Sequence, residues 1–154
     1  MPSLFNKPLN RIVQNDFGGA LFAQIGPNAT LAYMIPGVVV ANDTYDNCFR
    51  EATDPSNNIG VLGYEETLPA NQPLSITSAY TATGTKVAIH NTPGMRFHAW
   101  IAANQSVKPG TRLKCTAAGQ LTQTTSPSDP VNAVALETVT GTSAFQAWCI
   151  WTMR

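Results

Sequence analysis

Short apolar runs separated by turn signals extend along most of the chain and predict β-strands. Residues 97–103 (FHAWIAA) and 111–115 (TRLKC) flank Pro109-Gly110, a pair that suits a type II turn because Pro presets φ and Gly supplies a positive φ. Further strand-like runs cover residues 31–41, 48–51, 59–64, 74–78, 86–90, 131–137 and 145–153. Turn signals about every 8 to 12 residues, without a sustained helical period, predict an all-β fold, a small β-barrel or sandwich of about eight to ten short strands.

The last run, residues 145–153, is apolar on both faces. One face carries Phe145, Ala147, Cys149, Trp151 and Met153, and the other carries Trp148 and Ile150. A strand with two apolar faces is buried on both sides, by its own core and by a further layer such as another subunit. Trp100, Trp148 and Ile150 are therefore candidates for a subunit interface.

Residues 1–30 carry apolar side chains without a clear period, and we separate them as an extended N-terminal arm from a β-barrel domain of residues 31–154. An arm of this kind becomes ordered against a neighbouring molecule; the alternative is an edge strand and loop packed on its own domain. The candidate binding residues of the arm are Leu4, Phe5, Leu9, Ile12, Val13, Phe17, Leu21 and Phe22.

Charge is scarce and balanced, with nine basic and nine acidic residues and a charged fraction of 12%. A nucleic-acid-binding protein is expected to show a basic excess or stripe, so we expect no nucleic-acid partner. Low net charge is unfavourable for a free monomer and is better tolerated in a protein packed against others. The apolar runs are too short to span a membrane, and no signal peptide precedes them. Three widely spaced cysteines predict free thiols and folding in a reducing cytoplasm.

Candidate catalytic and metal-binding residues are few. His90 and His98 flank a Pro93-Gly94 turn that would bring them together as a hairpin, but a metal site needs a third ligand. Adjacent carboxylates at residues 65–66 point to opposite faces of a strand. The acidic residues between 43 and 54 lack the ordered pattern of a calcium loop. We expect no catalytic residue, no metal and no cofactor.

The second half of the chain carries an ordered succession of short motifs. A strand ending in small apolar residues leads into Val107-Lys108-Pro109-Gly110-Thr111-Arg112-Leu113, then residues 118–121 (AGQL), 132–137 (NAVALE) and the final strand 144–151. This succession resembles the small all-β decoration (cement) proteins of tailed-bacteriophage heads, whose barrel is often called a β-tulip. The resemblance covers residues 59–154, with a weaker echo at residues 36–40.

The resemblance implies a structural virion protein that acts without enzymatic activity. Such a protein is made in the host cytoplasm, sits as a homotrimer on the outer surface of the capsid, and cements major capsid proteins while its arm touches neighbouring decoration subunits. Two other classes remain open. A carbohydrate-binding or adhesion module would need Trp100 or Tyr80 exposed along a shallow groove, and a β-barrel nucleotide hydrolase would need an acidic residue such as Asp129 or Glu137 at a trimer interface.

Overall fold

The structure is a computed structural model that describes residues 13–14, 20–66 and 73–153. As the sequence predicts, the described chain is all-β, and it is built from thirteen short strands and brief 3₁₀ turns. The strands are β1 (Val13–Gln14), β2 (Leu21–Ile25), β3 (Val39–Asn42), β4 (Cys48–Glu51), β5 (Asn58–Glu66), β6 (Lys86–His90), β7 (Arg96–Ile101), β8 (Gln105–Val107), β9 (Arg112–Cys115), β10 (Leu121–Gln123), β11 (Ala133–Ala135), β12 (Val139–Gly141) and β13 (Phe145–Trp151).

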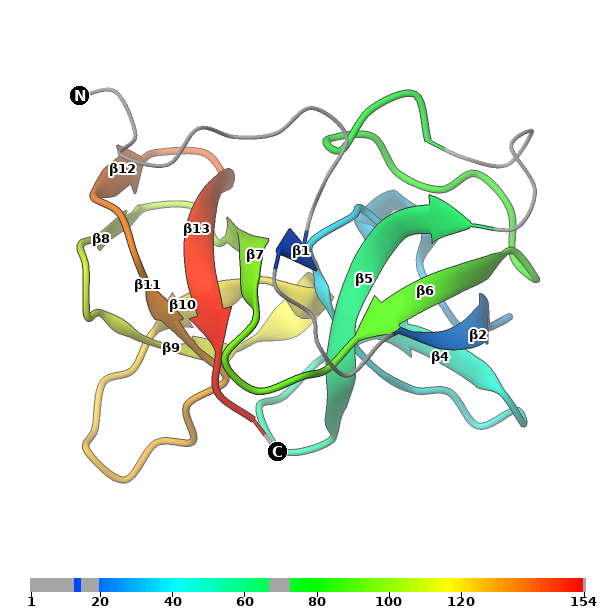
Figure 1. The fold of residues 1–154 in the computed structure, drawn as a ribbon, viewed down its shortest axis with the longest axis horizontal. Coiled ribbons are helices and arrows are strands. Elements are labelled where there is room, and N and C mark those ends of the chain that lie inside the picture. The colour runs from blue at the N-terminus through cyan, green and yellow to red at the C-terminus, as the bar shows by residue number, and fades with distance from the viewer. Residues whose placement is uncertain (1–12, 15–19, 67–72, 154) are drawn as a thin grey trace.

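The first half of the chain forms a closed five-stranded barrel, seen on the right of Figure 1. Its strands follow the order β2-β4-β3-β5-β6, and β2 closes the ring by pairing with β6. The interior is filled by one side of each strand, as the alternation of a strand requires. Its largest buried side chains are Ile25, Met34, Phe49, Leu62, Tyr80 and Ile89.

The second half forms another five-stranded ring, on the left of Figure 1. Its order is β7-β10-β9-β11-β13, and pairing between β7 and β13 closes it. Strand β1 adds to the free part of the β7 edge, with Val13 opposite Phe97. Strands β8 and β12 pair separately as a two-stranded ribbon. The side chains of Ala147, Cys149 and Trp151 face this core, which confirms the predicted inner face of the last strand.

The two barrels share a tightly packed joint. Val39 and Val61 point away from the interior of the first barrel and join the core of the second. Hydrogen bonds cross the joint as well. The backbone amide of Gly119 donates to the carbonyl of Ala52 at 2.9 Å, and the side-chain indole of Trp100 donates to the carbonyl of Pro36 at 3.0 Å. The barrels therefore behave as one packed body.

Several local expectations are wrong. The chain folds into two barrels instead of one, and Pro93-Gly94 connects β6 of the first to β7 of the second instead of forming a hairpin. Residues 31–33 form a 3₁₀ turn, and residues 74–78 form turns instead of a strand. Residues 138–143, expected to be only a turn, contain β12. The Pro109-Gly110 turn is confirmed, because Gly110 has a φ of +89°.

Candidate functional site

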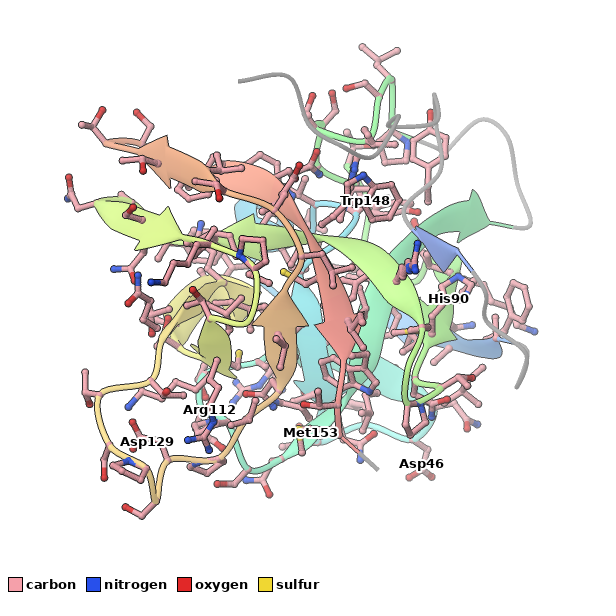
Figure 2. All side chains as sticks on the ribbon, turned by 60° about the vertical axis from the view of Figure 1, so that its left-hand side comes forward. Asp46, His90, Arg112, Asp129, Trp148 and Met153 are labelled. Carbon is pink, nitrogen blue, oxygen red and sulfur yellow. The ribbon has the colours of Figure 1, made fainter. Side chains whose placement is uncertain are left out.

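A polar groove lies where the two barrels meet. Two adjoining depressions, of about 510 and 390 Å³, share Asn42, Asn58 and Ile59 and so form one continuous surface. We call it the amide groove; its lining residues are Leu21, Asn42, Ser56, Asn57, Asn58, Ile59, Asn91, Trp151 and Met153. Figure 2 shows Met153 toward the end of the molecule where Asp46 and Asp129 also lie.

The lining of the amide groove combines uncharged polar groups with apolar ones. Among the described residues, the side chains of Asn42, Ser56 and Asn57 make no hydrogen bond, and each is exposed. The side chain of Asn91 is likewise exposed and makes no hydrogen bond with the described residues. None of the described residues that line the groove is ionisable, so these residues offer hydrogen-bonding and apolar contacts to a ligand.

Backbone structure fixes the polar edge of the groove. The Asp54 carboxylate accepts hydrogen bonds from the amides of Ser56 (2.7 Å) and Asn57 (3.3 Å), which holds the loop before β5 in a tight turn. This use of an Asp side chain to accept from nearby amides is typical of Asx turns. Asn42 ends β3 opposite Phe49 of β4, so its backbone is held by the barrel.

The outer face of β2 forms a second candidate surface. A depression of about 390 Å³ is lined there by Phe22, Ala23, Gln24, Asp46, Asn47 and Lys86. Phe22 is 46% exposed, and Tyr45, which precedes Asp46 and Asn47 in the loop before β4, is 57% exposed. An aromatic side chain left this open on a paired strand is a candidate anchor for a partner protein.

The predicted arm residues fall in different places. Val13 lies in β1, and Leu21 and Phe22 lie in β2, an integral strand of the first barrel. The sequence grouped β2 with the arm because it lies near the N-terminus and lacks a clear period, but its pairing on both edges makes it part of the barrel wall. The other arm candidates, Leu4, Phe5, Leu9, Ile12 and Phe17, lie outside the described residues.

The predicted subunit-interface residues lie on the outer face of the second barrel. Trp148 is 1% exposed in a single chain, so its burial requires no second subunit. Trp100 packs against the core of the first barrel and therefore contributes to the joint within the chain. Ile150 is partly buried and pairs opposite Arg96. A role for these residues between subunits stays a prediction.

The two histidines are placed apart by the fold. His90 ends β6 in the first barrel, and His98 lies in β7 of the second, stacked edge-on against Trp148 with 4.0 Å between ring centroids. The described residues contain no group of three His, Cys, Asp or Glu side chains arranged to hold a metal ion.

The candidate carboxylates are used in structural contacts. Glu137 is 4% exposed and accepts a hydrogen bond from the amide of Trp148 at 2.8 Å. Glu51 accepts from the amide of Thr30, and Asp43 accepts from the side chain and amide of Asn28. Asp129 holds a loop, as described below. None of these four lines the amide groove.

The cysteines are free in the structure, as predicted. Burial raises the pKa of the Cys115 thiol to about 12, and the pKa of the buried Cys149 thiol is raised further by the same cause. Because the thiolate is the reactive form, both side chains act as small apolar residues of the core. No helix in the described part of the chain has the length and apolar character needed to cross a membrane.

The loop at residues 124–130 is held by Asp129. Its carboxylate accepts hydrogen bonds from Lys114 Nζ (3.0 Å) and from the amides of Thr125 (2.8 Å) and Ser126 (3.1 Å). The hydrogen bond from Lys114, together with those from the two amides, lowers the pKa of Asp129 to about 2. The sequence predicts an exposed loop over residues 122–130, because this segment lacks core-forming residues. It does not predict that the Asp129 carboxylate holds the loop in a turn.

Removing the lysine should move this pKa in a measurable way. In Lys114→Met, we expect the pKa of Asp129 to rise from about 2 but to stay below its ordinary 3.8, because the amides of Thr125 and Ser126 still donate. Since the folded pKa is depressed, the stabilising contribution is present above the ordinary pKa and is lost as pH falls through about 2. Carboxyl ¹³C NMR titration measures the shift; an unchanged pKa would show that the lysine contributes nothing.

The asparagines of the groove were missed by sequence reasoning. Asn42, the pair Asn57-Asn58 and Asn91 come from three separate parts of the sequence, and each stands where asparagine is an ordinary turn or strand-end residue. Only the closure of the first barrel and its docking on β13 bring them together. The one available signal was that Asn42, Asn58 and Asn91 directly precede or follow an expected strand.

The chain was matched to known proteins by its structure and not by its sequence. No protein-family model matches the chain, and no curated protein matches it. Six solved chains match in structure; one is the N base of the head fibre protein gp8.5 of bacteriophage phi29, with a TM-score of 0.45 and 15% identity. The match covers 88% of this chain and 97% of that one. A likeness at this level does not decide the function, which we argue from the chain itself.

Proposed function

We propose that this protein is a structural component of a tailed-phage head, a non-enzymatic protein that binds the outer surface of the capsid as a homotrimer. It would cement contacts between major capsid proteins and touch neighbouring decoration subunits. The proposal is supported by the succession of motifs between residues 59 and 154 and by the surface of β2. The observation that carries it is the exposure of Phe22 on a strand paired along both edges.

The exposed side chains of β2 supply a physical basis for attachment. Phe22 is 46% exposed on the outer face, although Ala23 and Ile25 of the same strand fill the barrel. Aromatic side chains that become buried at the centre of an interface contribute much of the binding free energy. Burial of apolar area is worth about 25 cal/mol per Å², so small contacts repeated over a shell stabilise it strongly. Three linked copies would raise occupancy through effective concentration.

The cysteines and the charge balance support synthesis in the host cytoplasm and a location on the outer surface of the virion. Free thiols, two of them buried, suit synthesis in a reducing host cytoplasm before assembly on the virion. The chain has no excess of basic residues for packaged nucleic acid, which favours the outer surface of the shell over its interior.

Substitution of Phe22 tests the attachment surface. We expect Phe22→Ser to weaken binding to expanded, undecorated heads by about tenfold or more, as for loss of an interface aromatic. Co-sedimentation of labelled protein with heads measures the affinity. Leu74→Ser is the matched control, since Leu74 is 97% exposed but lies outside β2, and it should bind as the wild type does.

Two outcomes would contradict the proposal in different ways. If Phe22→Ser binds heads as well as the wild type, the β2 surface is not the attachment site. If the wild type does not bind heads at all, the proposed function is wrong. A truncation to residue 25 is unsuitable for this test because it would remove β2 and open the first barrel.

A further inference from the structure

The amide groove exposes polar side chains that take part neither in the packing of the barrel core nor in the outer surface of β2. Three exposed asparagine amides and one serine hydroxyl make no hydrogen bond with described residues, and they come from three separate segments. The apolar side chains of Leu21, Ile59 and Met153 line the same surface. The described lining residues thus combine polar and apolar groups on one surface and carry no charge.

We propose that the amide groove binds a neutral carbohydrate. A side-chain amide both donates and accepts, so it matches sugar hydroxyls, which do the same. The side-chain oxygen of Asn58 is buried beside the groove and makes no hydrogen bond in the described part of the chain. This oxygen has almost no accessible surface, so the exposed amides of Asn42, Asn57 and Asn91 are the groups that a ligand would contact. The C–H faces of a sugar ring would lie on the apolar residues.

The groove is preorganised for such a ligand. The carboxylate of Asp54 fixes the backbone of Ser56 and Asn57, and strand pairing fixes Asn42 and Asn58. A ligand therefore orders only side chains on binding, which keeps the entropic cost low. The indole of Trp151 is only 2% exposed and offers little stacking area. Binding at one site is accordingly weak, and several copies on one particle would strengthen it.

Other ligand classes fit the groove less well. A phosphate or nucleic acid needs cationic side chains, and none is present among the described lining residues. A metal ion needs carboxylate, imidazole or thiolate ligands, and the lining residues that the structure describes supply none of these. An extended peptide would add to a free strand edge, but β3, β5 and β13 are each paired on both sides. A sugar is recognised by side chains alone and needs no free edge.

The experiment uses the full chain and three neutral probes, maltotetraose, chitotetraose and mannotetraose, with a heparin tetrasaccharide as the anionic probe. Binding is followed by the side-chain NH₂ signals of asparagine in ¹H–¹⁵N NMR. We expect at least one neutral probe to shift the signals of Asn57 and Asn91. The double variant Asn57→Ala/Asn91→Ala should bind it roughly tenfold more weakly, the result of losing two neutral hydrogen bonds.

Gln24→Ala is the matched control, because Gln24 is an exposed amide on the outer face of β2 and should leave sugar binding unchanged. Both altered asparagines are exposed, and an unchanged melting temperature would confirm that the double variant folds. The proposal is overturned if no neutral probe shifts these signals, if only the heparin probe does, or if the double variant binds as tightly as the wild type. It does not depend on attachment to a head.

Discussion

Gly37→Ala is expected to lower the free energy of unfolding by about 3–5 kcal/mol, the sum of backbone strain and overpacking at the joint between the barrels. Gly37 has a φ of +95°, a conformation that favours glycine. A Cβ placed there would lie closer than 3.0 Å to the carbonyl oxygen of His98 in β7. The amide of Gly37 also donates to Leu62 at 2.8 Å, so the segment cannot easily move aside.

Gly110→Ala separates the two causes of this loss. Gly110 has a similar φ of +89°, but a Cβ there meets no atom within 4 Å. We expect this control to lose about 1–2 kcal/mol, from backbone strain alone. Urea denaturation of both variants measures the difference, and equal losses would show that the barrels are not packed closely at Gly37.

Trp151→Ala is expected to cost about 3–5 kcal/mol, as for removal of a large aromatic side chain from a core. Trp151 is 2% exposed and packs edge-on against Phe97, with 5.9 Å between ring centroids. Its amide also donates to the carbonyl of Met95, which ties the end of β13 to the start of β7. Such a loss should lower the melting temperature by about 10 °C.

The exposed Tyr45 supplies the control for this core substitution. Tyr45→Ala removes an aromatic ring that is 57% exposed, and we expect a change within about 0.5 kcal/mol. Thermal unfolding followed by circular dichroism compares the two variants. A loss below about 1 kcal/mol in Trp151→Ala would mean that Phe97 and Trp151 do not hold the second barrel together.

Local features of the fold were predictable because local chemistry determines them. Glycine after proline supplies the positive φ of a turn, and Gly110 has it. The alternation in residues 145–151 identified the side of β13 that faces the core. The second apolar face was also correctly expected to be buried, as Trp148 shows. Each of these features depends on residues close together in the chain.

The number of barrels was not predictable in the same way. A period of two assigns side chains to faces but does not say which strands pair. Pro93-Gly94 has the sequence of a hairpin turn, yet it connects strands of different barrels, and no linker composition marks the change. The amide groove depends on this closure, because it unites residues from β3, β5 and the end of β13. Because these residues come from separate strands, no single sequence motif predicts the groove.

The two proposed binding surfaces lie on opposite sides of β2. Leu21 lines the amide groove, whereas Phe22 lines the outer depression, because adjacent residues of a strand point to opposite faces. Attachment through Phe22 would therefore leave the asparagines of the groove open to a ligand. The variants Phe22→Ser and Asn57→Ala/Asn91→Ala should accordingly affect head binding and sugar binding separately.

Electron cryomicroscopy of the phage head from which the protein comes tests the proposed function most directly. We expect density for paired barrels on the outer surface of the expanded shell, grouped in threes at three-fold or quasi-three-fold positions and with β2 facing the major capsid protein. Heads that lack this density in the presence of saturating protein, or barrels bound as single copies with β2 facing solvent, would contradict it.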